Sequence, residues 1–314
     1  MADLNVSRSG QIQLAGAVDA LFLKLFSGEV LVNFDANCVF QDKHVVRSIS
    51  QGKSAQFPAI GNISAAYHTP GTQLVGTPVA HNEKVITIDD LLLANVMIAD
   101  IDEAKNHYDV RSEYSRQMGQ ALAVIYDKNV ARVSVLNARA AAVVPGMAGG
   151  TTINGGVNVR TDGTAISNAL FASAQTMDEN NVPEQDRYAF MRPVTFYAAA
   201  KTTTLINKDW GGKGSIAEGK IETLAGISIV KTNHLPNTDE SSAAGVPTKY
   251  RGDFSDTAIL VQNRQAVGTV KLMDLSTQAE YQTLFQATAM VARMAVGHGG
   301  LRPDCGIEIA AVAP

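Results

Sequence analysis

The sequence predicts an α+β fold, and three observations support this class. Apolar residues follow a helical period from about 112 to about 142, enough for a helix of roughly 45 Å. Strand-like alternation at 44–60 and 83–88 flanks a long irregular stretch, as in an extended two-stranded arm. Helix and strand signals then alternate from about 160 to 262, as in a compact α/β lobe. With 314 residues, 46% of them hydrophobic, the chain can form two lobes, or one lobe with large extensions, around a real core.

The N-terminal residues predict a short amphipathic helix after a polar tail. Five apolar residues fall on one helical face before Ser27-Gly28 ends the run: Leu14, Val18, Leu21, Phe22 and Leu25. A helix this short is unstable alone, so its apolar stripe must dock on something. The sequence leaves two docking sites open, one on the same subunit and one on a neighbouring subunit or an assembly partner.

The arm is predicted from two strand-like segments joined by a long connection. Val46, Ser48, Gly52, Ser54 and Phe57 alternate along the first segment, and 83–88 forms the second. The connection is rich in glycine and proline, has no period, and is long enough to be either functional or disordered. Because two strands alone are only marginally stable in water, the arm itself argues for a partner to lie on.

The central helix is predicted from a broad apolar face that includes Met118, Leu122 and Ile125, and Pro145-Gly146 ends the pattern. After a glycine-rich break, Asp162 is expected to cap a second helix and Pro193 to begin a third. The remaining expectations follow in chain order: strands at 187–191, 227–230, 267–272 and 307–312, loops at 210–214 and 233–252, a strand in preference to a helix at 277–295, and a tight turn at 298–303.

Charge and cysteine content exclude several classes of protein. The net charge of -4 is unlike that of a dedicated nucleic-acid binder, so any contact with DNA is expected to be weak and non-specific. Charged residues make up only 18% of the chain, which suits a surface hidden against neighbours. Cys38 and Cys305 form no disulfide framework and fit a reducing cytosol. We see no signal peptide, and the apolar stretch at 91–98 is too short to span a membrane.

The motifs that could carry chemistry are incomplete. Gly52-Lys53-Ser54 resembles the end of a phosphate-binding loop, but Arg47 stands where that loop needs a glycine. His298-Gly299-Gly300 resembles an oxyanion turn, yet the nucleophile elbow that would accompany it is absent. The six histidines lack metal-ligand spacing. We therefore predict no catalytic residue, no metal site and no cofactor.

One acidic group leaves two readings open. Its members could hold a divalent cation, or they could form the solvated start of a helix: Asp89, Asp90, Asp100, Asp102 and Glu103.

A set of short segments resembles one family, in order and spacing, from about 44 to 114 and again from about 266 to 303. The segments are Val46-Arg47-Ser48-Ile49-Ser50, Gly52-Lys53-Ser54-Ala55-Gln56-Phe57-Pro58, Glu83-Lys84-Val85-Ile86-Thr87-Ile88-Asp89, Asn106-His107-Tyr108-Asp109-Val110-Arg111-Ser112-Glu113-Tyr114, Ala266-Val267-Gly268-Thr269-Val270-Lys271-Leu272 and Met294-Ala295-Val296-Gly297-His298-Gly299-Gly300-Leu301-Arg302-Pro303. Together they resemble the major capsid proteins of short-tailed bacteriophages (podoviruses) of the Teseptimavirus type.

The resemblance implies the HK97-like phage capsid fold and a division of the chain. It implies an N-terminal arm at 1–43 and an extended β-hairpin loop at 44–88. It also implies a peripheral domain at 89–159 and 263–314 with the long spine helix, and an axial α/β domain at 160–262.

By the same resemblance, the subunits are expected to form homo-hexamers and homo-pentamers of an icosahedral shell around double-stranded DNA. A scaffolding protein during assembly and a portal at one vertex are the other implied partners, with no membrane. Assembly is expected in the host bacterial cytoplasm, and the product is the virion capsid.

Eight residues are candidates for contacts between subunits: Arg47, Lys53, Phe57, Glu83, Lys84, Arg111, Glu113 and Arg302. Two other functions remain as alternatives. An encapsulin-like compartment with the same fold would hold enzyme cargo in place of a genome, and a soluble α/β enzyme would show a ligand-sized pocket.

Overall fold

The computed structural model describes residues 38–99 except 64, 66, 74, 75, 77, then 110–202 and 221–312, together with Val30, Asn33 and Phe34. They divide into two compact units: Met1–Cys38, Asp90–Tyr126 and Leu272–Val296 form the first, and Val39–Asp89, Asp127–Lys271 and Gly297–Pro314 form the second. The predicted N-terminal stripe, from Leu14 to Leu25, lies outside the described residues.

In the first unit, strands pack beside the first part of the central helix. The helix, α3 (Val110–Ala138), confirms the predicted spine but ends four residues before the expected 142. The stretch at 277–295 is β structure and not helix, as favoured, but it is not one strand: residues 283–286 form the turn between β10 (Val267–Gln282) and β11 (Ala287–Gly300). β11 pairs antiparallel with β4 (Leu92–Ala99). Gly119 of α3 lets the backbone of Val30 approach the helix closely, since a Cβ at Gly119 would lie 2.8 Å from the carbonyl oxygen of Val30.

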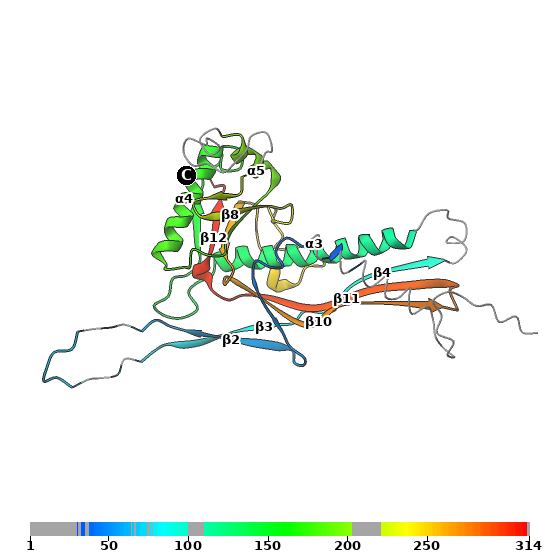
Figure 1. Ribbon diagram of the computed structural model, residues 1–314, viewed down its shortest axis with the longest axis horizontal. Helices are drawn as coiled ribbons and strands as arrows, with labels where there is room; N and C mark the ends of the chain where they lie inside the picture. Colours follow the sequence, from blue (N-terminus) through cyan, green and yellow to red (C-terminus); the bar gives the residue numbers. More distant parts are fainter. Residues whose placement is uncertain are drawn as a thin grey trace, which may run out of the picture. The chain divides into compact units, whose positions relative to one another are not determined.

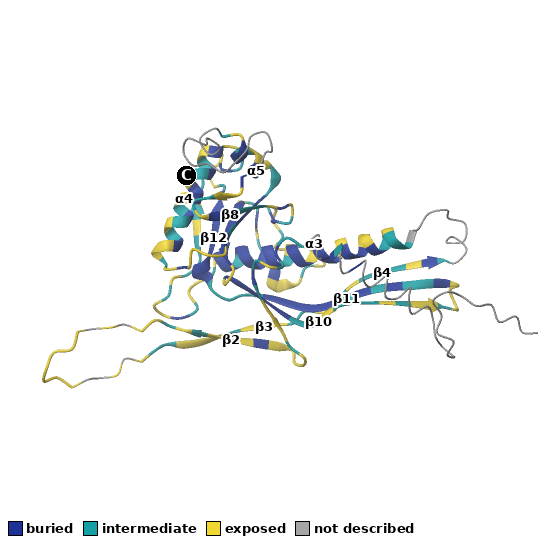
Figure 2. Ribbon diagram, in the orientation of Figure 1, coloured by how far each residue is buried: buried dark blue, intermediate teal, exposed yellow. Residues whose placement is uncertain are grey.

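The second unit contains a mixed six-stranded sheet in the order β5-β12-β9-β6-β8-β7 (Figure 1). Its strands are β5 (Thr151–Asn154), β6 (Arg187–Met191), β7 (Thr223–Leu224), β8 (Ile227–Lys231), β9 (Thr257–Asn263) and β12 (Gly306–Ala310). Both β9 and β12 are buried along their whole length, so they form the centre of this core (Figure 2).

The helices of this lobe begin where the sequence predicts. Asp162 caps α4 (Gly163–Glu179) by accepting a hydrogen bond from the amide of Thr164 at 2.9 Å. Pro193 is the first residue of α5 (Pro193–Ala200), where the missing amide hydrogen costs nothing. Short 3-10 turns, η2 (Thr248–Tyr250) and η3 (Pro303–Cys305), complete the regular structure.

The arm is a hairpin of β2 (Ser54–Ile60) and β3 (His81–Thr87), paired from Ser54↔Thr87 to Ile60↔His81. The prediction of one strand at 44–60 was wrong in part. The backbone turns at Gly52, where φ is +114°, and the preceding β1 (Val45–Ser48) pairs in parallel with β10 instead. The arm therefore consists of β2, β3 and their connection, and β1 belongs to another sheet.

The tight turn predicted at 298–303 was also displaced. His298, Gly299 and Gly300 are still in β11. The chain turns after them, where the amides of Leu301 and Arg302 both donate to the carbonyl oxygen of Ala266.

Candidate intersubunit surfaces

The root of the arm packs by apolar contacts onto the rest of the second unit, to which the arm belongs. Ala55, Ile86 and Val270 form a buried cluster, with Phe57 and Leu301 packed against it. Two glycines near the end of β11 explain this close packing. A Cβ on Gly297 would lie 2.1 Å from the carbonyl oxygen of Thr87, and one on Gly299 would lie 2.8 Å from Ile86. These glycines thus make room for β3, so the arm leaves the body from a fixed base.

A polar cluster fastens the end of β3 on the same base. The ammonium of Lys249 lies 2.6 Å from the Asp89 carboxylate and donates to the carbonyl oxygen of Thr87 at 2.8 Å. The hydroxyl of Tyr250 donates to Asp89 and accepts from the amide of His298 at 3.0 Å. Burial, together with the charge of Asp89, raises the pKa of Tyr250, so its hydroxyl stays protonated and keeps donating.

Two buried histidines lie beside this cluster. The hydroxyl of Thr269 joins Nε2 of His44 to Nδ1 of His298, at 2.8 Å each. Burial lowers the pKa of His44 to about 4, although the carbonyl oxygen of Phe40 and the charge of Asp127 oppose the shift. Burial also lowers the pKa of His298 well below its ordinary value. Both rings are therefore neutral at pH 7.

The eight candidate residues do not form one site. Arg47 lies in β1, beside the arm. Its guanidinium donates to the carbonyl oxygen of Gln56 at 3.0 Å and lies 5.6 Å from the centre of the Phe57 ring. The Arg47 guanidinium therefore already interacts with groups of its own subunit. Lys53 and Glu83 are exposed on the arm.

Arg111 and Glu113 belong to the first unit. The Glu113 carboxylate pairs with Arg116 on the same helix at 2.5 Å and also accepts from Gln117. The guanidinium of Arg116 and the Gln117 amide lower the pKa of Glu113 to about 2. This carboxylate therefore already has a cation of its own subunit beside it.

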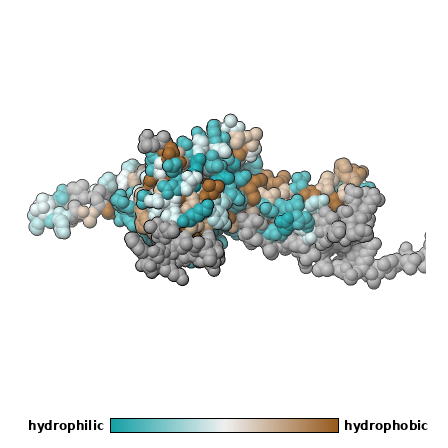
Figure 3. Space-filling view, turned by 90° about the horizontal axis from the view of Figure 1, so that it is seen from above, coloured by the Kyte–Doolittle hydropathy of each residue, from teal (hydrophilic) through white to brown (hydrophobic). Residues whose placement is uncertain are grey.

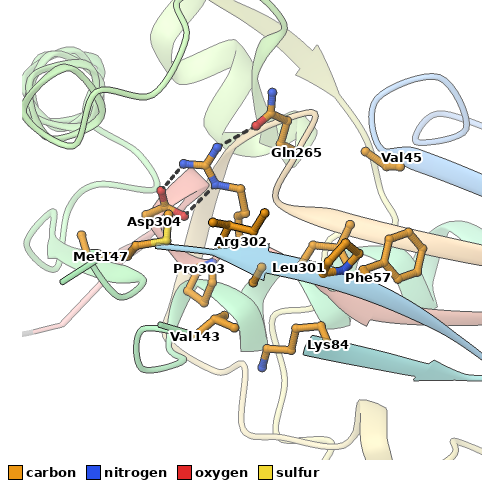
Figure 4. Close-up of a pocket in the computed structure, with 14 residues that line it drawn as sticks. Val45, Phe57, Lys84, Val143, Met147, Gln265, Leu301, Arg302, Pro303 and Asp304 are labelled. Carbon is orange, nitrogen blue, oxygen red and sulfur yellow. Dashed lines mark hydrogen bonds and ion pairs between the residues drawn. The ribbon is translucent and has the colours of Figure 1, made fainter. Parts of the chain in front are cut away.

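Phe57, Lys84 and Arg302 do come together, at the edge of a groove of about 320 Å³ beside the arm root (Figure 4). Ten of its lining residues are apolar: Val45, Phe57, Pro58, Ala59, Ile60, Val143, Met147, Ala148, Leu301 and Pro303. Arg302 is held at its rim by Asp304 at 2.5 Å and by Gln265 at 2.8 Å, as the dashed lines in Figure 4 show. The sequence signals for this groove were spread over six segments, so only its three candidate members could be named in advance.

Large apolar side chains also reach the surface at several places (Figure 3). The end of the β10–β11 hairpin is the most exposed of them in the first unit, with Leu284 94% and Phe285 67% exposed. Sequence analysis missed this end, although two adjacent large apolar residues in a turn between strands are the signal that could have found it.

The described residues add neither a metal site nor a membrane-spanning helix to these surfaces. Among the described residues, His, Cys, Asp and Glu form no group that could hold a metal ion. None of the helices searched in the described chain is long and apolar enough to cross a membrane. Of the acidic group, Asp100, Asp102 and Glu103 lie outside the described residues. The strand β4 follows Asp89, so this residue does not stand at the start of a helix, and its carboxylate belongs to the polar cluster at the arm root.

Comparisons with known proteins agree with one another. The model of the Gp10A-like family, described as major capsid proteins, matches residues 56–310. The chain is 36% identical to the major capsid protein of Escherichia phage T7, over 92% of this chain and 91% of that protein. It is 35% identical to the major capsid protein of Enterobacteria phage T3, over 95% and 93%. The solved capsid structure of cyanophage P-SCSP1u is 47% identical, covers 99% of this chain and 100% of its own, and superposes with a TM-score of 0.82.

Proposed function

This chain belongs to the Gp10A-like family of major capsid proteins, and from that premise we propose how its copies build a shell. It is a structural protein with the HK97-like fold, and it is not an enzyme. Its place is in the virion capsid. We propose that the copies associate as hexamers and pentamers that close an icosahedral shell around double-stranded DNA.

The proposed division of labour follows the resemblance given above. Residues 1–43 serve as the N-terminal arm, a segment distinct from the β2–β3 hairpin, and 44–88 serve as the extended loop. Residues 89–159 with 263–314 form the peripheral domain, and 160–262 form the axial domain. The arm root supports this division, because packing and the Asp89 cluster hold the hairpin at its base while Ile63 and Tyr67 of the connection stay exposed. A hairpin held only at its root gains its remaining contacts from another subunit.

Contacts between copies are proposed at the exposed charges of the arm and at the groove. Lys53 and Glu83 are exposed, Lys84 lines the groove, and each of their contacts is weak alone. Closure of the shell repeats each contact many times, so modest contacts suffice and misplaced subunits can still dissociate.

The packaged genome, a scaffolding protein, a portal and assembly in the bacterial cytoplasm complete the proposal. The net charge of -4 supports a wall that does not hold DNA tightly. The match along nearly the whole length of the phage T7 protein carries the proposal, since a shared fold alone would also fit a shell that holds enzyme cargo.

Nuclease digestion of purified particles tests this proposal. Particles from phage-producing cells should protect genome-length double-stranded DNA, and particles opened by heat should lose that protection. Intact particles that contain protein cargo and no protected DNA would contradict the proposal and favour the compartment alternative.

A further inference from the structure

The groove at the arm root offers an apolar floor and a basic rim. Phe57 and Ile60 of the arm, Met147 beyond α3, and Leu301 line it, at a volume of about 320 Å³. Arg302 is already engaged by Asp304 and Gln265. Within the described part of the chain the ammonium of Lys84 makes no ion pair, so the rim can still receive a carboxylate. An apolar pocket with a charged rim is the usual place for the central anchor of a protein interface.

The end of the β10–β11 hairpin has the opposite shape. Its turn is braced from within, because the amide of Phe285 donates to Gln282 at 3.0 Å and the side chain of Gln286 donates to the carbonyl oxygen of Thr283 at 2.8 Å. The Tyr281 hydroxyl donates to the side chain of Gln286 at 3.2 Å. Leu284 and Phe285 are thus presented outward on a fixed turn, and little conformational entropy is lost when such side chains are buried.

The charges of the two surfaces are complementary. The hairpin segment 272–290 contains Asp274 and Glu280 and no lysine or arginine. The groove is lined by two basic residues, Lys84 and Arg302, against one carboxylate, Asp304, which already holds Arg302. Contact between an acidic and a basic surface fixes the register and disfavours contact between like surfaces.

Building on the proposed function, we propose that the outer part of the β10–β11 hairpin of one subunit docks in the arm-root groove of a second copy. Leu284 and Phe285 are the apolar anchors, and Glu280 faces the ammonium of Lys84 at the rim. The two surfaces differ, so the contact is head-to-tail and can repeat around a ring.

Disulfide trapping tests the contact in assembled particles. Leu284→Cys combined with Ala148→Cys should give a ladder of cross-linked chains on a non-reducing denaturing gel after mild oxidation. Each single variant, which retains Cys38 and Cys305, should run as a monomer, and so should Leu284→Cys with Phe171→Cys on α4. Particles of the first pair that give no more cross-linking than the controls would overturn the inference.

Blocking variants test the same contact without cysteine chemistry. Ala148→Trp should fill the groove and Phe285→Asp should remove an anchor, and each should lower the yield of particles at least tenfold with unchanged circular dichroism. The matched controls, Ala142→Trp outside the groove and Thr283→Asp in the same turn, should assemble like the wild type. Normal yields from both blocking variants would overturn the docking contact, whereas a wild-type protein that forms no particles would instead overturn the proposed function.

Discussion

At the scale of single residues, the pair of buried histidines makes the subunit sensitive to acid. His44 is 1% exposed and its pKa in the folded subunit is about 4, below its ordinary value of 6.5. The unfolded chain therefore binds protons more readily than the folded chain between these two values. Stability is highest above pH 6.5 and is lost as the pH falls towards 4. His298 contributes in the same direction, because burial also lowers its pKa.

The pH dependence of unfolding tests this residue. From the shift of His44, the free energy of unfolding should fall by about 2 kcal/mol between pH 7 and pH 5, in addition to the contribution of His298. His44→Gln should lose that share of the pH dependence, whereas His81→Gln, at an exposed position of the arm, should keep all of it. Urea unfolding of disassembled subunits at pH 7 and pH 5 measures the change in the free energy of unfolding. An equal change for wild type and His44→Gln would contradict the assignment.

Gly297 and Gly299 show what the sequence could not reveal about individual residues. Gly299 was predicted to form a turn together with Gly300, because local turn chemistry is the usual reason for two adjacent glycines, and Gly297 carried no prediction. Their actual role is to let β3 approach β11 closely, and β3 is far away in the sequence. Glycines that serve a close approach and glycines that serve a turn look alike until the neighbouring strand is known.

At the scale of elements, an ion pair joins the end of α3 to β12. The guanidinium of Arg139, just beyond the helix, binds both carboxylate oxygens of Glu308, at 2.5 and 2.6 Å. Glu308 is 1% exposed and also accepts from the hydroxyl of Thr257 at 2.6 Å. The hydrogen bonds with Glu308 raise the pKa of Arg139, so the guanidinium stays positively charged at acidic and neutral pH.

Loss of one partner should cost much more than loss of both. Arg139→Met leaves a buried carboxylate without its cation and should lower the free energy of unfolding by about 3–5 kcal/mol. The double variant Arg139→Met with Glu308→Leu should recover most of that loss. Arg116→Met, at the exposed pair with Glu113, is the control and should leave the free energy of unfolding almost unchanged, because solvent screens this pair. Chemical denaturation measures all three, and a double variant less stable than the single one would contradict this account of the pair.

Most elements could be predicted from the sequence, because their signals are local. The apolar face of α3, the cap at Asp162 and the proline at the start of α5 all act within a few residues. The parallel pairing of β1 with β10 could not be predicted in this way, since no local pattern states which distant strand is the partner. The same limit applies to the groove, whose lining comes from six separate segments.

At the scale of the whole molecule, the ordered set of segments predicted the family, and the comparisons confirm it. The surfaces between copies were harder to predict, because residues that face a neighbour in a shell look like ordinary exposed residues in one chain. Of the eight residues proposed from sequence, three share the groove, whereas Arg47 and Glu113 already have partners within their own subunit. The exposed pair Leu284 and Phe285 emerged only from the structure.

Electron microscopy of the purified protein, expressed with and without a scaffolding protein, tests the central claim most directly. In the proposed shell each subunit completes its arm and hairpin contacts with other copies, so we expect closed icosahedral particles or rings of five and six subunits. The contacts are non-covalent, and the same particles boiled in denaturant should run as a single band at 33.3 kDa. A monodisperse monomer at every concentration, with or without the scaffold, would contradict the account.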